Sequence, residues 1–265
     1  MGCSGLRLLW MLLPQPTACD CRKRRIIIEM DTNRGKVHHL FSHIAEKYDT
    51  MNTVLSLTLD KGWRQRTLAV AGPRKGEHWL DVCCGTGKLT LEIRRLLGAA
   101  GEVTGLDFNA SMLTVARRAE AEAKLSVPVR WVEADAMELP FPDESFDGVT
   151  VGFGLRNLPN LNQGIREMRR VLKPGGRWTC LDLSHPVWPI FRQGHAIFVR
   201  YVVPYVGNLG VGGGESYEWL PASLRRFPGA EELAARMRQE GLAQVGFERL
   251  SGGIAAVHTG IKPRG

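Results

Sequence analysis

The sequence predicts an α/β protein built on a doubly wound, seven-stranded, mostly parallel sheet of the Rossmann-like kind. From residue 78 onward, short apolar runs alternate with segments whose apolar residues recur at helical spacing. A Gly-x-Gly turn separates the first run from the first such segment, and aspartates lie at or near the ends of the first three runs. Because helices between strands act as crossover connections, neighbouring strands are expected to pair in parallel.

The elements follow from these patterns in chain order. A helical segment is expected before the sheet, and the helix after the second strand opens at Asn109, a capping residue type. The motif "KPGG" should end a helix before the fifth strand, and an aromatic, Pro- and Gly-rich insertion follows that strand at 186–228. The expected strands are 78–84, 101–108, 128–135, 145–154, 177–184, 245–251 and 254–261, and the expected helices are 36–72, 88–97, 109–124, 162–172 and 230–242.

Composition sets broad limits on the class of protein. The chain has 265 residues, 44% hydrophobic and 23% charged, with a net charge of +8, which suits one large soluble domain with a solvated basic surface. Six cysteines show no C-x-x-C spacing, so a reduced, cytoplasmic protein is the simplest interpretation. No apolar run reaches the ~18–20 residues that span a bilayer.

The first 29 residues differ in character from the rest. An apolar stretch, "LRLLWMLLP", precedes "TACDC" and "RKRR", which makes a poor signal peptide. We interpret 1–29 as an extension of uncertain status, either dispensable or the result of a start codon placed too early. Residues 30–265 are then a single domain, within which 186–228 covers the substrate.

The glycine turn and its acids point to one class of ligand. A dinucleotide fingerprint requires a third glycine where this chain has Thr90, and Asp81 would repel a pyrophosphate. Asp107, about twenty residues beyond Gly87, is placed to bind ribose hydroxyls, and Asp135 ends the third strand. Three carboxylates at one sheet edge suit S-adenosylmethionine, which carries a ribose, an amino group and a sulfonium but no phosphate. Cys83 and Cys84 are then small packing residues rather than metal ligands, and no metal is expected.

Specific motifs then add a resemblance. The segments "LDVCCGTG", "GLDFNASML", "ADAMELPFPDESFD" and "RVLKPGG" resemble class I S-adenosylmethionine-dependent methyltransferases. More narrowly, "FSHIAEKYDTMNTVLS", "GFGLRN", "RVLKPGGRWTCLDLS" and "SYEWLPASLRRFP" resemble the demethylmenaquinone/ubiquinone C-methyltransferase family, from about Val37 to Lys262. Overall similarity leans to the members that methylate demethylmenaquinol, the last step of menaquinone biosynthesis.

The resemblance implies a cofactor site and three departures from the family pattern. Gly152 lies where many members have Ser, Asp60 where they usually have His, and Asp182 where they usually have Glu. The first puts one polar cofactor contact in doubt, and the second changes a charge. The expected cofactor-binding residues are Tyr48, Asp81, Gly85, Thr86, Gly87, Asp107, Asp135, Ala136 and Gly152.

Three residues are expected to act on the acceptor. Arg156, after the fourth strand, would stabilise a quinolate, Asn157 would orient the ring hydroxyl, and His185 is a candidate general base. Alternatively, Arg156 is a structural pin that pairs with Asp182 or Glu144, and His185 is an exposed loop residue.

The remaining expectations concern the substrate and its surroundings. Asn52, in "YDTMN", and Tyr217 are expected on the substrate side, the latter lining the quinol pocket or simply packing. The insertion would cover the isoprenoid tail, touch the membrane transiently or merely cover the core, which places the enzyme at the inner face of the membrane. No nucleic-acid partner is expected, and the oligomeric state is left open between monomer and homodimer.

The alternative functions would use the same cofactor-binding residues. One is a methyltransferase for another small acceptor, such as a benzoquinol, a sterol or a polyketide ring. Another is a non-catalytic S-adenosylmethionine-binding or RNA-associated protein, against which stand the intact acids and the lack of arginine–aromatic interleaving. An NAD-dependent dehydrogenase is disfavoured by Thr90 and Asp81.

Overall fold

The computed structural model describes residues 35, 38–188, 193–194 and 215–264. The chain divides into two units at Val37, and everything described below belongs to the second, which starts at His38. The predicted extension 1–29 and most of the insertion 186–228 lie outside the described residues.

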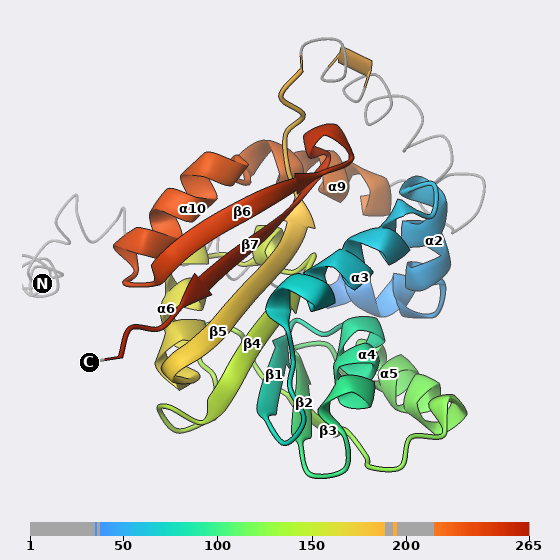
Figure 1. Ribbon diagram of the computed structural model, residues 1–265. Helices are drawn as coiled ribbons and strands as arrows, with labels where there is room; N and C mark the ends of the chain where they lie inside the picture. Colours follow the sequence, from blue (N-terminus) through green and yellow to red (C-terminus); the bar gives the residue numbers. More distant parts are fainter. Residues whose placement is uncertain (1–34, 36–37, 189–192, 195–214, 265) are drawn as a thin grey trace, which may run out of the picture. The chain divides into compact units, whose positions relative to one another are not determined.

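Seven strands form one sheet in the order β3-β2-β1-β4-β5-β7-β6 (Figure 1). Neighbours from β3 to β5 pair in parallel, whereas β7 is antiparallel to both β5 and β6. The predicted seven-stranded, mostly parallel sheet is confirmed. The strands are β1 His78–Val82, β2 Glu102–Asp107, β3 Arg130–Glu133, β4 Phe146–Gly152, β5 Leu172–Leu183, β6 Ala243–Leu250 and β7 Ala255–Ile261.

Helices cover both faces of this sheet. α3, α4 and α5 pack on one face, and α6 and α10 on the other. Residues 38–44 are also helical. The other helices are η2 Ala45–Lys47, α2 Tyr48–Leu55, α3 Leu59–Ala71, α4 Lys88–Leu97, α5 Ala110–Ala123, η3 Leu155–Asn157, α6 Leu161–Val171, α9 Glu215–Arg226, α10 Ala230–Gln239 and η5 Ser251–Gly253.

Alternation along the strands explains why both faces are covered. In β1, Trp79 joins the core under α3 and α4, while Leu80 and Val82 join the core under α6 and α10. All three side chains are fully buried. The order of strands reverses between β1 and β4, so their carboxyl ends form the topological switch point where ligands bind in such sheets.

Local sequence signals set most helix ends. Asn109 caps α5 as predicted, with its side chain accepting from the backbone N–H of Met112. Helix α6 ends at Val171, just before "KPGG" as predicted, but β5 starts at Leu172 and includes this motif, so the predicted strand start at 177 was wrong. Residues 173–176 form an irregularity in β5, at which the β4 register jumps. Gly175 N and Gly176 O bond to Lys262, which satisfies the backbone groups that this irregularity leaves unpaired.

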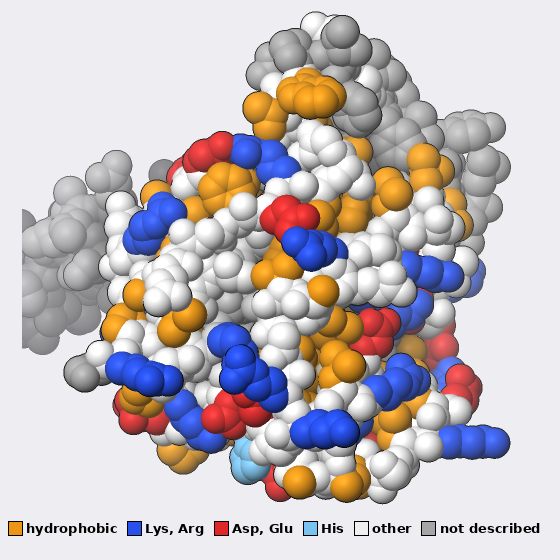
Figure 2. Space-filling view, in the orientation of Figure 1, with side chains coloured by type: hydrophobic (Ala, Val, Ile, Leu, Met, Phe, Trp, Pro, Cys, Tyr) orange, Lys and Arg blue, Asp and Glu red, His pale blue; other side chains and the backbone are white. Residues whose placement is uncertain are grey.

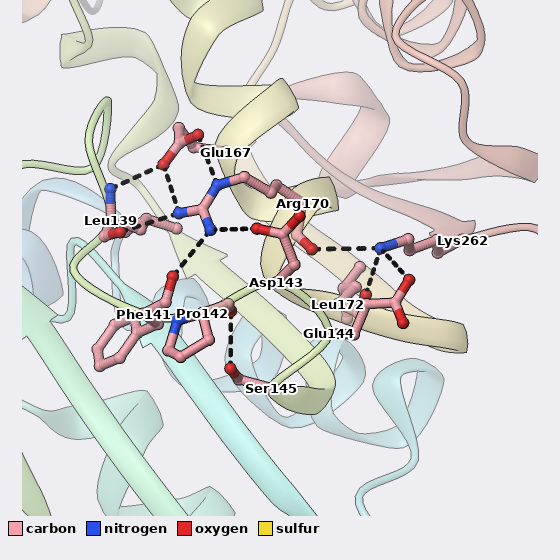
Figure 3. Close-up of polar contacts among 10 residues, drawn as sticks. All are labelled: Leu139, Phe141, Pro142, Asp143, Glu144, Ser145, Glu167, Arg170, Leu172 and Lys262. Atoms are coloured by element: carbon pink, nitrogen blue, oxygen red, sulfur yellow. Dashed lines mark hydrogen bonds and ion pairs between the residues drawn. The ribbon is translucent and has the colours of Figure 1, made fainter.

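One partly buried polar network, in which Asp143 is exposed, fixes the loop after β3. Arg170 of α6 bonds the backbone carbonyls of Leu139 and Phe141 and pairs with Glu167 and Asp143 (Figure 3). Glu167 also accepts from the backbone N–H of Leu139 at 2.9 Å. The loop that begins at Asp135 is thereby tied to α6.

In the part of the chain that the structure describes, no helix combines the length and the apolar character needed to cross a bilayer.

Candidate active site

The loop from β1 to α4 turns so tightly that three of its residues, Cys83, Gly85 and Gly87, have φ of +54°, +55° and +79°. A Cβ on Gly87 would lie 2.6 Å from Cη2 of Trp131, so only glycine fits there. A Cβ on Gly85 would meet nothing within 4 Å. Gly85 therefore presents bare backbone to open space at the carboxyl edge of the sheet.

The two cysteines of this loop are packing residues in the structure. A Cβ on Gly154 would lie 2.4 Å from Cβ of Cys83, so that cysteine packs directly on the turn after β4. Burial raises the pKa of both the Cys83 and the Cys84 thiol well above the usual value, which keeps them protonated and unreactive. Among the described residues, we find no group of three or more His, Cys, Asp or Glu side chains able to hold a metal.

Two of the predicted acids, Asp81 and Asp107, are brought together beside the loop. Asp81 is buried in β1 and accepts from the hydroxyls of Thr90 at 2.6 Å and Thr150 at 2.8 Å. Asp107 ends β2 and accepts from the backbone N–H groups of Gly85 at 2.8 Å and Asn109 at 3.0 Å. The Thr90 that breaks the dinucleotide fingerprint thus serves to hold Asp81.

Burial dominates the electrostatics of these acids. It raises the pKa of Asp81 to about 6, although bonds from Thr90 and Thr150 oppose the shift. It also raises the pKa of Asp107 to about 6, against the backbone bond from Gly85. The charge of Asp107 also raises the pKa of Asp81. Negative charge at this edge is therefore held at a cost that a hydrogen-bond donor or a cation would relieve.

The third predicted acid, Asp135, follows β3. Its Oδ1 accepts from the backbone N–H of Met137 at 2.9 Å, in the loop that Arg170 holds. Ala136 is buried in the core under α6 and α10. The three strand ends therefore converge as the sequence predicts, with Asp135 on a separately anchored loop.

Helix α2 contacts the glycine loop through a residue that the sequence reasoning missed. Asp49 accepts from the hydroxyl of Thr86 at 2.7 Å, and its second oxygen lies 3.5 Å from Nζ of Lys88. The available signal was its place beside Tyr48 in "YDTMN", a motif already assigned to the site. Asp49 ties the amino-terminal helices to the loop.

Arg156, predicted to act on the acceptor, lies in η3 directly after β4. It is buried, and its Nη1 lies 2.6 Å from Oδ1 of Asp182 and 2.7 Å from the carbonyl oxygen of Phe153. Although burial disfavours its charge, Asp182 raises the pKa of Arg156 above the usual value. The pairing with Asp182 is the one that the structural alternative predicted, whereas Glu144 pairs with Lys262 instead.

The Arg156 guanidinium also faces helix α2. Its side chain is hydrogen-bonded to Tyr48, and Tyr48 is bonded to Asn52. Burial raises the pKa of Tyr48, so its phenol stays protonated, although Arg156 opposes that shift. Asn157 lies one residue beyond, its amide 3.4 Å from the carbonyl oxygen of Phe153. The structure thus joins Tyr48, Asn52, Arg156 and Asp182 in one chain of polar contacts.

The remaining predicted residues are not part of this chain of contacts. His185 is exposed, and its Nε2 lies 3.1 Å from the carbonyl oxygen of Phe227. Tyr217 lies in α9, with its side chain outside the described residues. A Cβ on Gly152 would lie 3.5 Å from Leu89, an ordinary contact, so the serine of other members would fit there.

Asp60, at the position where relatives usually have His, is a helix contact. It is 1% exposed at the start of α3, pairs with Arg64 and accepts from the hydroxyl of Ser56 at 3.0 Å. The charge that this substitution introduces is thus compensated within α2 and α3, away from the glycine loop.

Comparisons with known proteins agree with this geometry. The sequence model of the ubiE/COQ5 methyltransferase family matches residues 29–262. Demethylmenaquinone methyltransferases from Staphylococcus aureus strains JH9 and Newman are each 44% identical over 232 residues, which cover 88% of this chain and 95% of theirs.

Solved structures show the same fold. A SAM-dependent methyltransferase from Aquifex aeolicus is similar with a TM-score of 0.55 and 17% identity, over 75% of this chain and 89% of that one. The [4+2]-cyclase SpnF is similar with a TM-score of 0.64 and 19% identity, over 86% and 96%.

Proposed function

We propose a reaction from one premise: the chain belongs to the ubiE/COQ5 methyltransferase family and is an S-adenosylmethionine-dependent methyltransferase. The proposed reaction is C-methylation of demethylmenaquinol to menaquinol, the last step of menaquinone biosynthesis. The observation that carries the acceptor half is the buried Arg156, bonded to Tyr48 of α2 and paired with Asp182 at the end of β5. The printed names of the 44% identical relatives support the naphthoquinol ring.

The residues at the sheet edge fit this cofactor. Gly85 has open space where a side chain would stand, and Asp107 lies beside it with two backbone donors already holding its carboxylate. When bound, S-adenosylmethionine supplies a methyl group activated by a positive sulfonium. Asp107 would accept from its ribose hydroxyls, and the Asp135–Ala136 pair would border its adenine.

The rest of the proposed cofactor site lies in and around the loop. Thr86 and Tyr48 would close it from the α2 side, and Gly87 and Gly152 let the backbone approach. Asp81 supports the loop from beneath through Thr90.

The acceptor residues would act by position and charge. A ring carbon becomes nucleophilic as its neighbouring hydroxyl loses a proton. Arg156 would stabilise that oxygen anion, and Asn157 would orient the hydroxyl. The carbon–methyl bond would then form as the methyl–sulfur bond breaks, leaving the neutral thioether and a ring ketone. The proton on the methylated carbon would pass to a base and the ring oxygen would take up a proton, which restores the quinol with a net release of one proton. Holding these atoms in line at about 3–3.5 Å is the main task of the protein.

His185 is proposed as a base with a specific restriction. With Nε2 donating to the carbonyl of Phe227, only Nδ1 can take up a proton. Asn52 and Tyr217 are proposed on the substrate side, the first through its bond to Tyr48.

The wider setting is also a proposal. Residues 30–265 would form one methyltransferase domain, whose insertion 186–228 covers the prenyl tail. We propose peripheral contact with the inner face of a membrane that holds the quinol, without a nucleic-acid partner. A homodimer is compatible with this account.

The proposed reaction is tested by measuring which of two quinols accepts the methyl group. Purified protein is incubated with methyl-labelled S-adenosylmethionine and either reduced demethylmenaquinone or a demethoxy-benzoquinol, and label is followed into the quinone extract. We expect label in the naphthoquinol alone. Label in the benzoquinol alone would overturn the assigned ring, and label in neither, with the cofactor bound, would overturn the acceptor class.

A further inference from the structure

The exposed large apolar side chains of the described residues fall mainly in two groups toward one edge of the sheet, at 54–59 and at 187–188. In the described part of the chain, six large apolar side chains are exposed. Leu96 stands apart from the other five, near the end of α4. We call those five the edge patch, and they are Val54, Leu57, Leu59, Val187 and Trp188.

The edge patch lies at the carboxyl edge of the sheet, on the same side as the active site. Leu59 begins α3, which runs from that edge back toward the start of β1, and Val187 follows the carboxyl end of β5. Figure 2 shows hydrophobic side chains at the upper end of the view, above the end of β5 and beside α2. Leu96 instead ends a helix that starts at the glycine loop, so it lies toward the opposite edge.

The α2–α3 corner is rigid and strained. Leu57 and Thr58 have φ of +52° and +68°, a left-handed backbone that two adjacent non-glycine residues rarely share. Backbone bonds from Leu57 N to Val54 O and from Thr58 N to Thr53 O lock this turn. In this turn the side chain of Leu57 is 71% exposed. Folding alone gives no reason to hold a leucine outward in a strained turn.

The exposed charge around the α2–α3 corner is positive. Between residues 50 and 63 the charged side chains are Asp60 and Lys61. Asp60 is buried and paired with Arg64, whereas Lys61 is exposed. The corner therefore presents apolar and cationic groups without an exposed acid, which complements an anionic lipid surface. At 69% exposure, Trp188 supplies the side-chain type favoured at a membrane–water interface.

We propose that the edge patch docks on an anionic phospholipid bilayer and aligns the active site with the lipid that carries the acceptor. This rests on the proposed function, because a prenylated quinol is held in the membrane. Helix α2 links the two places: Tyr48 at its start contacts Arg156, and the helix ends at Leu55, about 10 Å along the helical rise and two residues before Leu57. A ring bound beside Arg156 would leave its tail toward the edge patch.

The test compares one pair of substitutions with a matched control. Leu57→Asn removes the apolar side chain and suits the left-handed backbone better than leucine does, so the variant should fold. Trp188→Gln removes the aromatic ring, and Leu96→Asn is the control at the opposite edge. Full-length protein is floated with phosphatidylglycerol vesicles and with phosphatidylcholine vesicles. Methyl transfer is measured with a long-tailed quinol in the vesicles and with a short-tailed quinol in solution.

We expect Leu57→Asn/Trp188→Gln to weaken phosphatidylglycerol binding about tenfold or more and to slow transfer to the vesicle-held quinol in proportion. Turnover of the short-tailed quinol should stay within twofold, as should every value for Leu96→Asn. Equal vesicle binding by both variants would overturn the docking surface. So would a wild-type dimer that the double variant alone converts to monomer, because the edge patch would then be a contact between copies. If the wild type does not methylate the short-tailed quinol, the proposed function is wrong instead.

Discussion

Asp107 and Asp81 carry the most informative charges at the scale of single residues. Burial raises both pKa values to about 6, above the ~3.9 of an unfolded aspartate. Their contribution to folding is therefore fully present below pH ~3.9 and is lost as the pH rises through about 6. A ligand that donates hydrogen bonds to the ionised carboxylates should reverse part of that loss.

The raised pKa of Asp107 predicts how the binding of S-adenosylmethionine depends on pH. The affinity for S-adenosylmethionine should fall as the pH is lowered from 7.5 to 5, because a protonated Asp107 offers ribose hydroxyls fewer acceptor sites. Calorimetric titration at several pH values measures it. Asp107→Asn should bind weakly and lose most of the pH dependence; an unchanged slope in that variant would contradict the assignment.

The pair Arg156 and Asp182 tests the acceptor side. Arg156→Lys keeps a charge but loses the planar fork that contacts Asp182 and Phe153 together. We expect kcat to fall about 100-fold, with the dissociation constant of S-adenosylmethionine within twofold of wild type. Asp182→Glu is the control, since it keeps the carboxylate and restores the residue usual among relatives. Wild-type kcat in Arg156→Lys would leave Arg156 as a structural pin.

Among the elements, α2 contacts the glycine loop through Asp49. Asp49→Ala removes the acceptor of the Thr86 hydroxyl and the partner of Lys88. We expect S-adenosylmethionine to dissociate about tenfold faster, measured by stopped-flow displacement, because α2 is no longer tied to the loop. Glu46→Ala is a matched carboxylate deletion in the preceding turn, where Glu46 pairs with the exposed Arg118. Equal off-rates in the two variants would rule out a closing role for Asp49.

Helix α6 supports the site from the other face. Arg170→Gln should unfasten the loop at 139–143 and lower Tm by roughly 5 °C, since charge-assisted bonds of this kind are worth about 2 kcal/mol together. Arg166→Gln, on the same helix with an exposed partner, should change Tm by about 1 °C or less. Thermal unfolding followed by circular dichroism checks both, and equal shifts would contradict the anchoring role.

At the scale of the whole molecule, periodicity was enough to predict the sheet, and parallel pairing brings the strand-end aspartates to one edge of it. These predictions succeeded because such signals are local. Asn109 caps the helix that directly follows it, and Asp107 is the last residue of its own strand. The irregularity in β5 was missed because its stabilising partner, Lys262, lies almost ninety residues away. The contact between Asp49 and Thr86 was missed for the same reason, since nothing near either residue in sequence indicates that α2 lies over the loop.

The central claim is methyl transfer to a ring carbon by this enzyme. The most direct measurement is a single turnover with trideuteromethyl-labelled S-adenosylmethionine and reduced demethylmenaquinone, followed by mass spectrometry and NMR of the product. The account predicts a product heavier by one CD3 group in place of the ring hydrogen, with both oxygens unmethylated. A methyl group on oxygen, or a recovered quinone without label from protein that binds the cofactor, would contradict it.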